Sequence, residues 1–140
     1  MHFDGRGSKI MVADNDRAVL EMLQIRLDVA GYHAIAVRSG ADAIDMLQSL
    51  RPTAMVMDLN LPDIDGFEFL HAVNTRPKSI PFPTLVIGRK MGIDDVKRAV
   101  SLGARDCMAK PFSGADILDR LTRMLARAAA APPRPVAWVA

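Results

Sequence analysis

The chain has 140 residues, of which half are hydrophobic and 24% are charged, a composition that fits one globular domain with its own core. Its formal net charge of +2 is too small to indicate a nucleic-acid-binding protein, and its single cysteine, Cys107, excludes an internal disulfide or a cysteine-based metal cluster. Because the N-terminus lacks a signal-peptide segment and no apolar run could span a bilayer, we expect a cytoplasmic protein without membrane insertion.

In chain order, five short apolar segments each precede a helical pattern of apolar residues. A polar stretch at 1–8 comes first and is expected to be a flexible N-terminus. A connection at 75–83 contains three prolines and is the longest irregular segment inside the domain. The apolar segments are typical of strands buried on both faces, and they lie at 9–13, 32–37, 53–57, 84–87 and 106–109.

Capping residues indicate where the helices between these strands begin and end. Ser39 and Ser113 each precede an aspartate by three residues, which forms an imperfect capping box at two helix starts. Gly31 follows the first helical pattern and is expected at its C-terminus, where a positive φ is common. The fourth helix is expected to start at Asp94 or Asp95.

This alternation predicts one α/β domain at 9–127, followed by an alanine- and proline-rich tail at 128–140. Short apolar strands joined through helices give a doubly wound (βα)5 parallel sheet, with right-handed crossovers and helices on both faces. Nothing in the sequence indicates internal repeats or a second domain. The carboxyl ends of the strands meet at one rim of such a sheet, where ligands bind.

Polar residues follow three of the predicted strands at this rim. Asp14 and Asn15 follow the first strand, Asp58 the third, and Lys110 the fifth. Clustered carboxylates repel one another and need a cation among them, and oxygen ligands in an open site favour Mg²⁺. Aspartates at strand ends can also simply begin turns and cap helices. That explanation suits Asp14 taken alone better than it suits the three sites together.

The combination of residues suits a phosphoryl acceptor. Asp58 would attack a phosphorus atom, Mg²⁺ would bridge carboxylate and phosphoryl oxygens, and Lys110 would neutralise a further oxygen. A weaker alternative is a small phosphatase that uses Asp58 as its nucleophile. That alternative lacks a second acid placed as a general acid.

These residues resemble the receiver domain of two-component response regulators, a flavodoxin-like fold whose strand order is 2-1-3-4-5. The resemblance runs from Lys9 to Arg127, and its most specific part is the loop that starts at Asp58. The matching segments are Asp14-Asn15, Asp58-Leu59-Asn60-Leu61-Pro62-Asp63-Ile64-Asp65-Gly66, Gly103-Ala104-Arg105-Asp106 and Lys110-Pro111-Phe112.

The resemblance implies roles for individual residues. Asp58 would be the phosphoacceptor, Lys110 would contact the phosphoryl group, and the peptide before Pro111 would be cis. The implied Mg²⁺ ligands are Asp14, Asn15, Asp58 and the backbone carbonyl of Asn60. Such a domain is not an enzyme, apart from self-phosphorylation by small phosphodonors.

Four positions depart from the family's usual pattern. Asn15 replaces the second acid after the first strand, so Mg²⁺ affinity should be weaker. Gly88 replaces the hydroxyl residue after the fourth strand, and Arg89 replaces the small residue that usually follows it. Cys107 replaces the switch aromatic of the fifth strand. Arg89 and the following Lys90 could hold an anion in place of the missing hydroxyl, or they could belong to a solvated basic loop.

Arginines along the last helix have two interpretations. They can compensate the helix dipole and pair at i,i+4, Asp116 with Arg120 and Asp119 with Arg123. Alternatively, arginines and a tryptophan can grip phosphates and stack on purines, as in receiver-like cyclic di-GMP-responsive motor regulators, which this chain loosely resembles. The residues of this alternative surface are Arg120, Arg123, Arg127, Arg134 and Trp138.

We therefore expect a stand-alone response regulator receiver that takes a phosphoryl group on Asp58 and acts through protein contacts. Its expected partners are a sensor histidine kinase or histidine phosphotransfer protein and a downstream protein. No helix-turn-helix or output domain follows Arg127, so DNA binding is not expected, and we expect a monomer or weak dimer. The alternative is a phosphorylation-independent binding module, with cyclic di-GMP as one candidate ligand.

Overall fold

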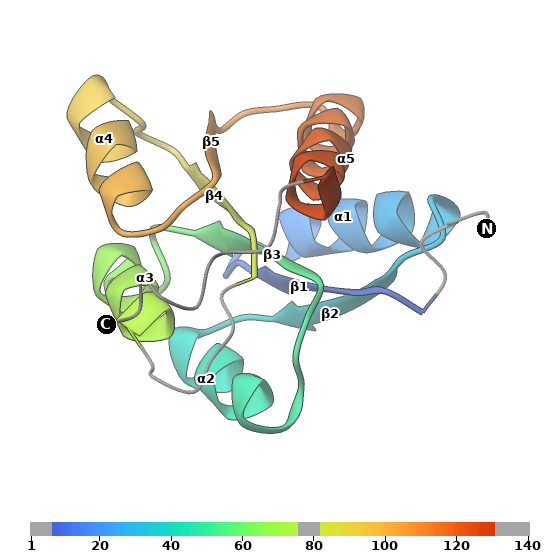
Figure 1. Cartoon of the computed structure of the whole chain (residues 1–140), viewed down its shortest axis with the longest axis horizontal. Coiled ribbons are helices and arrows are strands. Elements are labelled where there is room, and N and C mark those ends of the chain that lie inside the picture. Colours follow the sequence, from blue (N-terminus) through green and yellow to red (C-terminus); the bar gives the residue numbers. More distant parts are fainter. Residues whose placement is uncertain (1–6, 76–81, 131–140) are drawn as a thin grey trace.

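The computed structural model describes residues 7–75 and 82–130 (Figure 1). The predicted N-terminal segment, the proline-containing connection and the tail with Arg134 and Trp138 therefore lie wholly or largely outside the described residues. Strands and helices alternate along the chain in this order: β1 (Lys9–Ala13), α1 (Arg17–Val29), β2 (His33–Val37), α2 (Gly40–Ser49), β3 (Ala54–Asp58), α3 (Gly66–Thr75), β4 (Thr84–Gly88), α4 (Ile93–Ser101), β5 (Asp106–Ala109) and α5 (Gly114–Ala130).

The strands form one parallel sheet in the order β2-β1-β3-β4-β5, which confirms the predicted doubly wound topology. The chain runs outward in one direction from β1 to β2 and then returns through β3 to the other side. This reversal lies between β1 and β3, the kind of position at which ligands bind in open α/β sheets. β3 is the middle strand, and all five of its residues are buried.

Alternate side chains of the strands enter two separate hydrophobic cores. On one face Met11, Met55 and Val86 pack with residues of α2, α3 and α4; on the other Val12 and Ile87 pack with residues of α1 and α5. Figure 1 shows the same division, with α1 and α5 beside each other on one side of the sheet. Burial on both faces explains why the central strands read as continuous apolar runs in the sequence.

The predicted helix caps are largely confirmed. Ser39 Oγ accepts a hydrogen bond from Asp42 N at 3.1 Å, and Ser113 Oγ accepts one from Asp116 N at 3.0 Å. Gly31 follows α1 with a φ of 93°, as expected for a residue at a helix C-terminus.

The predicted start of α4 was wrong by one or two residues. The helix begins at Ile93, and Gly92 is its N-cap. Asp95 lies inside the first turn and accepts a hydrogen bond from the backbone N–H of Gly92 at 3.1 Å. Asp95 is the third residue of the helix, which is the position from which an acidic side chain closes a capping box. Among the described residues, no helix combines the length and the apolarity needed to cross a membrane.

The loop between β3 and α3 is fastened to the start of α2. Asp63 accepts hydrogen bonds from the backbone N–H groups of Gly40 at 2.8 Å and Ala41 at 2.9 Å. Ile64 fills the space in front of Gly40, where even a β carbon would collide with it. These contacts fix the loop that leaves Asp58 and thereby set the shape of the rim.

Candidate functional site

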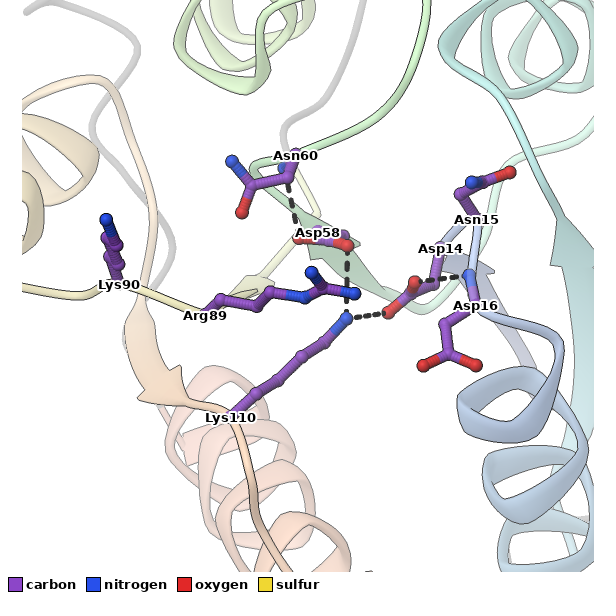
Figure 2. A pocket seen from close by; sticks show the side chains of 8 residues that line it. All are labelled: Asp14, Asn15, Asp16, Asp58, Asn60, Arg89, Lys90 and Lys110. Carbon is purple, nitrogen blue, oxygen red and sulfur yellow. Dashed lines mark hydrogen bonds and ion pairs between the residues drawn. The ribbon is translucent and has the colours of Figure 1, made fainter.

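Three strands bring Asp14, Asp58 and Lys110 together at the carboxyl end of the sheet (Figure 2). Asp58 is the last residue of β3, Asp14 follows β1, and Lys110 follows β5. Lys110 Nζ lies 3.1 Å from Asp58 Oδ2 and 2.8 Å from Asp14 Oδ2. Both aspartates are buried, with exposures of 0% for Asp14 and 5% for Asp58. One ammonium group thus neutralises part of the charge of two buried carboxylates.

Backbone contacts hold each of these side chains in place. Lys110 donates its N–H to the carbonyl of Gly88 at 2.8 Å, and the peptide bond between Lys110 and Pro111 is cis, as expected. The second oxygen of Asp14 accepts from the N–H of Asp16 at 2.8 Å. Asp58 Oδ1 accepts from the N–H of Asn60 at 3.0 Å. The three functional groups therefore sit on rigid strand ends rather than on a loop.

Burial and charge shift the pKa values of this cluster. Burial raises the pKa of Asp14 above its ordinary value, opposed by the hydrogen bond from Lys110 and assisted by the negative charge of Asp58. Burial acts to lower the pKa of Lys110, but hydrogen bonds to the two aspartates and their charges outweigh it, so this pKa is raised. Lys110 is consequently a firmly protonated cation that faces Asp58 Oδ2.

An open pocket of about 580 Å³ surrounds the cluster. Its lining residues are Asp14, Asn15, Asp16, Asp58, Asn60, Arg89, Lys90 and Lys110. Figure 2 shows the Arg89 side chain extending beside Lys110 toward the aspartates, whereas Lys90 stands apart from them. The side chain of Asn15 is directed away from Asp58. The predicted metal ligands therefore share one pocket with Lys110 and Arg89, but Gly88 is not among its lining residues, and the amide of Asn15 is directed away from Asp58.

The oxygen donors of the pocket fit a magnesium ion. Asp14 Oδ2 is buried, and among the described residues its polar contact is with Lys110 Nζ, at 2.8 Å. Such an oxygen retains a lone pair for a hard cation. Residues 7–75 and 82–130 contain no group of three or more histidine, cysteine or acidic side chains arranged for a metal. Asp14 and Asp58 would therefore need the Asn60 carbonyl and water to complete the coordination.

Asp16 also lines this pocket, although it was not singled out from the sequence. Its Oδ1 caps α1 by accepting from the N–H of Ala18 at 2.9 Å. The N-cap role was foreseeable from an aspartate just before the first helical pattern. Its position in the pocket depends on how α1 leaves β1, which no local sequence pattern encodes.

Of the two positions that depart from the family's switch residues, Gly88 lies beside the pocket and Cys107 packs against the hydrophobic core. A β carbon at Gly88 would lie 3.8 Å from Asn60 Oδ1, so a hydroxyl there would have reached the pocket. Cys107 is half-buried in β5. Its burial raises the pKa of its thiol, and the negative charge of Asp106 raises this pKa further. The thiol is thus held neutral and has no ring that could change position.

The arginines of α5 do not gather into a shared site within the described residues. Arg120 Nη1 donates to both carboxylate oxygens of Asp106 at 2.8 Å, so the predicted pairing with Asp116 was wrong. Asp106, on the neighbouring strand, offers two oxygens at once, which an i,i+4 count along one helix could not reveal. Arg123 does pair with Asp119, at 3.0 Å, as predicted. Arg127 is exposed.

The family model of the response regulator receiver domain matches residues 10–122, most of the chain. The chain belongs to this family. The match includes every residue of the cluster just described, from Asp14 to Lys110. The receiver domain is a signalling domain of two-component systems, and its flavodoxin-like topology is the one observed in this sheet.

Two relatives illustrate the sequence similarity. The receiver is 34% identical over 119 residues to the response regulator MprA of Mycobacterium tuberculosis, which covers 85% of this chain and 51% of that protein. It is 32% identical over 125 residues to the alkaline phosphatase synthesis transcriptional regulatory protein PhoP of Bacillus subtilis, covering 89% of this chain and 51% of that protein. The chain thus spans about half the length of these relatives.

Two solved structures illustrate the likeness of fold. The chemotaxis response regulator CheY4 of Vibrio cholerae superposes with a TM-score of 0.78 at 26% identity, covering 84% of this chain and 98% of that one. The BeF3-activated DrrB receiver domain superposes with a TM-score of 0.74 at 26% identity, covering 86% of this chain and 98% of that one.

Proposed function

We propose that this receiver accepts a phosphoryl group on Asp58 and passes the signal on through protein contacts, as a single-domain response regulator. The observation that supports this proposal most is the position of Asp58. Its carboxylate lies at the end of the central strand, faces an open pocket, and has the protonated Lys110 amine 3.1 Å from one oxygen. A carboxylate held in this way is oriented for attack and is partly charge-compensated.

The proposed reaction is a transfer between two nucleophiles. A carboxylate oxygen of Asp58 forms a bond to phosphorus, and the bond from phosphorus to the donor breaks. The donor is a phosphohistidine of a kinase or phosphotransfer protein, or acetyl phosphate. The electron pair of the broken bond stays with the donor, which leaves as the free histidine or as acetate. Lys110 holds a phosphoryl oxygen, and Asp14 holds Lys110. Bound by Asp14, Asp58 and the carbonyl of Asn60, Mg²⁺ would neutralise part of the phosphoryl charge.

The readout of this phosphorylation is proposed to be unusual. Gly88 offers no hydroxyl to the phosphoryl group, and Cys107 offers no ring to rotate. Arg89 lies in the pocket and is the group placed to contact the phosphoryl oxygens from that side. The downstream protein would then recognise the charge and the local geometry at the rim rather than a large movement of β5.

Phosphorylation with acetyl phosphate and Mg²⁺, followed by intact-mass spectrometry, tests the proposal. Wild type should gain one phosphoryl group, and Asp58→Asn should gain none. Asp65→Asn is a matched control, because it removes an exposed carboxylate from the same loop and should leave the gain intact. If neither acetyl phosphate nor a phosphorylated histidine phosphotransfer protein modifies wild type, the proposal is wrong. Beryllofluoride with Mg²⁺ provides a second readout of the same site.

A second candidate function is binding without phosphorylation, which the missing hydroxyl at Gly88 favours. The candidate ligand from the arginine pattern, cyclic di-GMP, gains no support from α5, because Arg120 is occupied by Asp106. Calorimetric titration with cyclic di-GMP decides this version. Absence of heat with wild type at high protein concentration would exclude it, whereas heat that Arg127→Ala removes would favour it.

A further inference from the structure

The pocket of this receiver contains as many cations as carboxylates. Asp14, Asp16 and Asp58 are balanced by three positive side chains, those of Arg89, Lys90 and Lys110. Lys110 is already committed to two carboxylates, at 2.8 and 3.1 Å. Formal charges in the pocket therefore cancel, and the environment is less favourable to a divalent cation than a purely acidic rim would be.

Arg89 is the cation with its charge available for a new anion. Its side chain is exposed, runs beside Lys110, and directs its guanidinium toward Asp58 and Asp14 (Figure 2). Lys90 also belongs to the lining, but its side chain stands apart from the aspartates. The two neighbouring residues thus carry the same charge at different positions relative to the acceptor, which provides an internal control.

Gly88 adds no side chain to the pocket beside Arg89. A β carbon there would be in ordinary contact with Met91, Asn60 and Leu59, at 3.5 to 3.8 Å. Arg89, which lines the pocket, is therefore the side chain next to the end of β4 that could reach oxygens bonded to a phosphorus on Asp58. Planar guanidinium groups match two such oxygens at once.

We infer that Arg89 supplies, in place of a divalent metal, part of the positive charge that a phosphoryl group on Asp58 requires. This inference rests on the proposed function. Phosphorylation replaces the single negative charge of the Asp58 carboxylate with about two negative charges on the phosphoryl group, and Lys110 is already paired with both Asp14 and Asp58. With Arg89 beside it, the phosphorylated site loses most of its dependence on Mg²⁺. The same guanidinium repels Mg²⁺ from the site before phosphorylation, so it should act in opposite directions on the two processes.

The test measures both processes in wild type, Arg89→Ala, Arg89→Lys and Lys90→Ala. The first readout is the rate of phosphorylation by acetyl phosphate, with EDTA and with saturating Mg²⁺. Arg89→Ala should lower the rate in EDTA roughly tenfold, the effect of one charged hydrogen bond, and much less at saturating Mg²⁺. Arg89→Lys keeps the charge and should recover part of the loss.

The second readout is the affinity of the unphosphorylated protein for Mn²⁺, followed by electron paramagnetic resonance with Mg²⁺ as competitor. Arg89→Ala should bind both ions about fivefold more tightly, because one positive charge is removed from the pocket. Lys90→Ala should change both readouts less. A residue that merely supported the fold would not slow one process and strengthen the other.

The outcomes separate this inference from the proposed function. A wild type that is phosphorylated, with Arg89→Ala and Lys90→Ala indistinguishable in both readouts, overturns the role of Arg89 and leaves Asp58 as the acceptor. A wild type that accepts no phosphoryl group in either EDTA or Mg²⁺ overturns both. Phosphorylation of wild type that stops completely in EDTA also overturns the role of Arg89.

Discussion

At the scale of single residues, Gly88 shows how a substitution can remove a contact without removing the room for it. A β carbon built there would lie 3.5 Å from Met91 Cε, which is an ordinary contact distance. The φ angle of Gly88 is not positive, so the backbone at this position suits any residue. The loss of the hydroxyl in this receiver is therefore a difference in chemistry and not a demand of packing.

Gly88→Ser should fold normally. Its free energy of unfolding in urea should be unchanged or higher by up to about 1 kcal/mol, because glycine weakens a strand interior. The proposed function adds that beryllofluoride with Mg²⁺ should stabilise this variant more than wild type, through a new hydroxyl contact. A variant that loses about 2 kcal/mol or more would show that the end of β4 has no room for a serine side chain.

Lys110→Met should lower the free energy of unfolding by about 3 kcal/mol at about pH 7, because it leaves two buried carboxylates without their cation. The raised pKa of Asp14 means that folding favours its protonated form, so the cost of ionising it is present at higher pH and relieved in acid. The difference between variant and wild type should accordingly shrink as the pH falls.

The raised pKa of Lys110 gives a second signature in the same urea experiment. The stability that Lys110 adds to the fold is fully present when the pH is below the ordinary pKa of lysine. It is lost as the pH rises through the raised pKa that Lys110 has in the folded protein. Wild type should therefore lose stability in strong alkali through this group, and Lys110→Met should lack that component. Equal pH profiles for the two proteins would contradict the ion pairs described at this site.

At the scale of elements, the loop after β3 is held by a neighbour that is distant in sequence. Asp63 lies 23 residues from Gly40 and 22 from Ala41, yet bonds to the N–H groups of both. These are groups at the start of α2 that have no partner within the helix. Local sequence identified the loop and the Ser39 cap, but not this second cap. The reason is that it depends on how α2 and the loop pack on the same face of the sheet.

Asp63→Asn should destabilise the protein at neutral pH and have little effect in acid. The N–H groups of Ala41 and Gly40 hold the pKa of Asp63 below its ordinary value. A carboxyl group with a lowered pKa stabilises the fold when the pH is above the ordinary pKa of aspartate. This stabilisation is lost as the pH falls through the lowered pKa of the folded protein. Urea midpoints from neutral to acidic pH measure the effect. Asp65→Asn, which removes an exposed carboxylate from the same loop, is the matched control.

At the scale of the whole molecule, the topology and the centre of the site were predictable for one physical reason. Strands buried on both faces read as apolar runs, so Asp58 stands out as the polar residue that ends the central one. Partners of long side chains were less predictable. Arg120 pairs with Asp106 instead of with an acid on its own helix, and the Asn15 side chain is directed away from Asp58. Such choices depend on surroundings built by several elements at once.

Asn15→Asp should strengthen the response of the whole domain to Mg²⁺. A metal that binds only the folded state raises the free energy of unfolding, and one more negative charge near the site is worth about 1 kcal/mol in a watery environment. The urea midpoint should therefore rise more with Mg²⁺ in this variant than in wild type. Asn15→Gln is the neutral control. Equal responses of all three proteins would argue against a metal beside Asp14.

The order of the strands has a consequence for the newly synthesised chain. Asp14 and Asp58 leave the ribosome early, but the lysine that compensates them follows β5, near the end of the domain. Until that strand pairs with β4, the two carboxylates have no ammonium group between them. Under the proposed function, the acceptor is therefore complete only when β5 is in place. A chain that has not yet formed β5 should accept phosphoryl groups poorly, because it lacks the lysine that compensates Asp14 and Asp58.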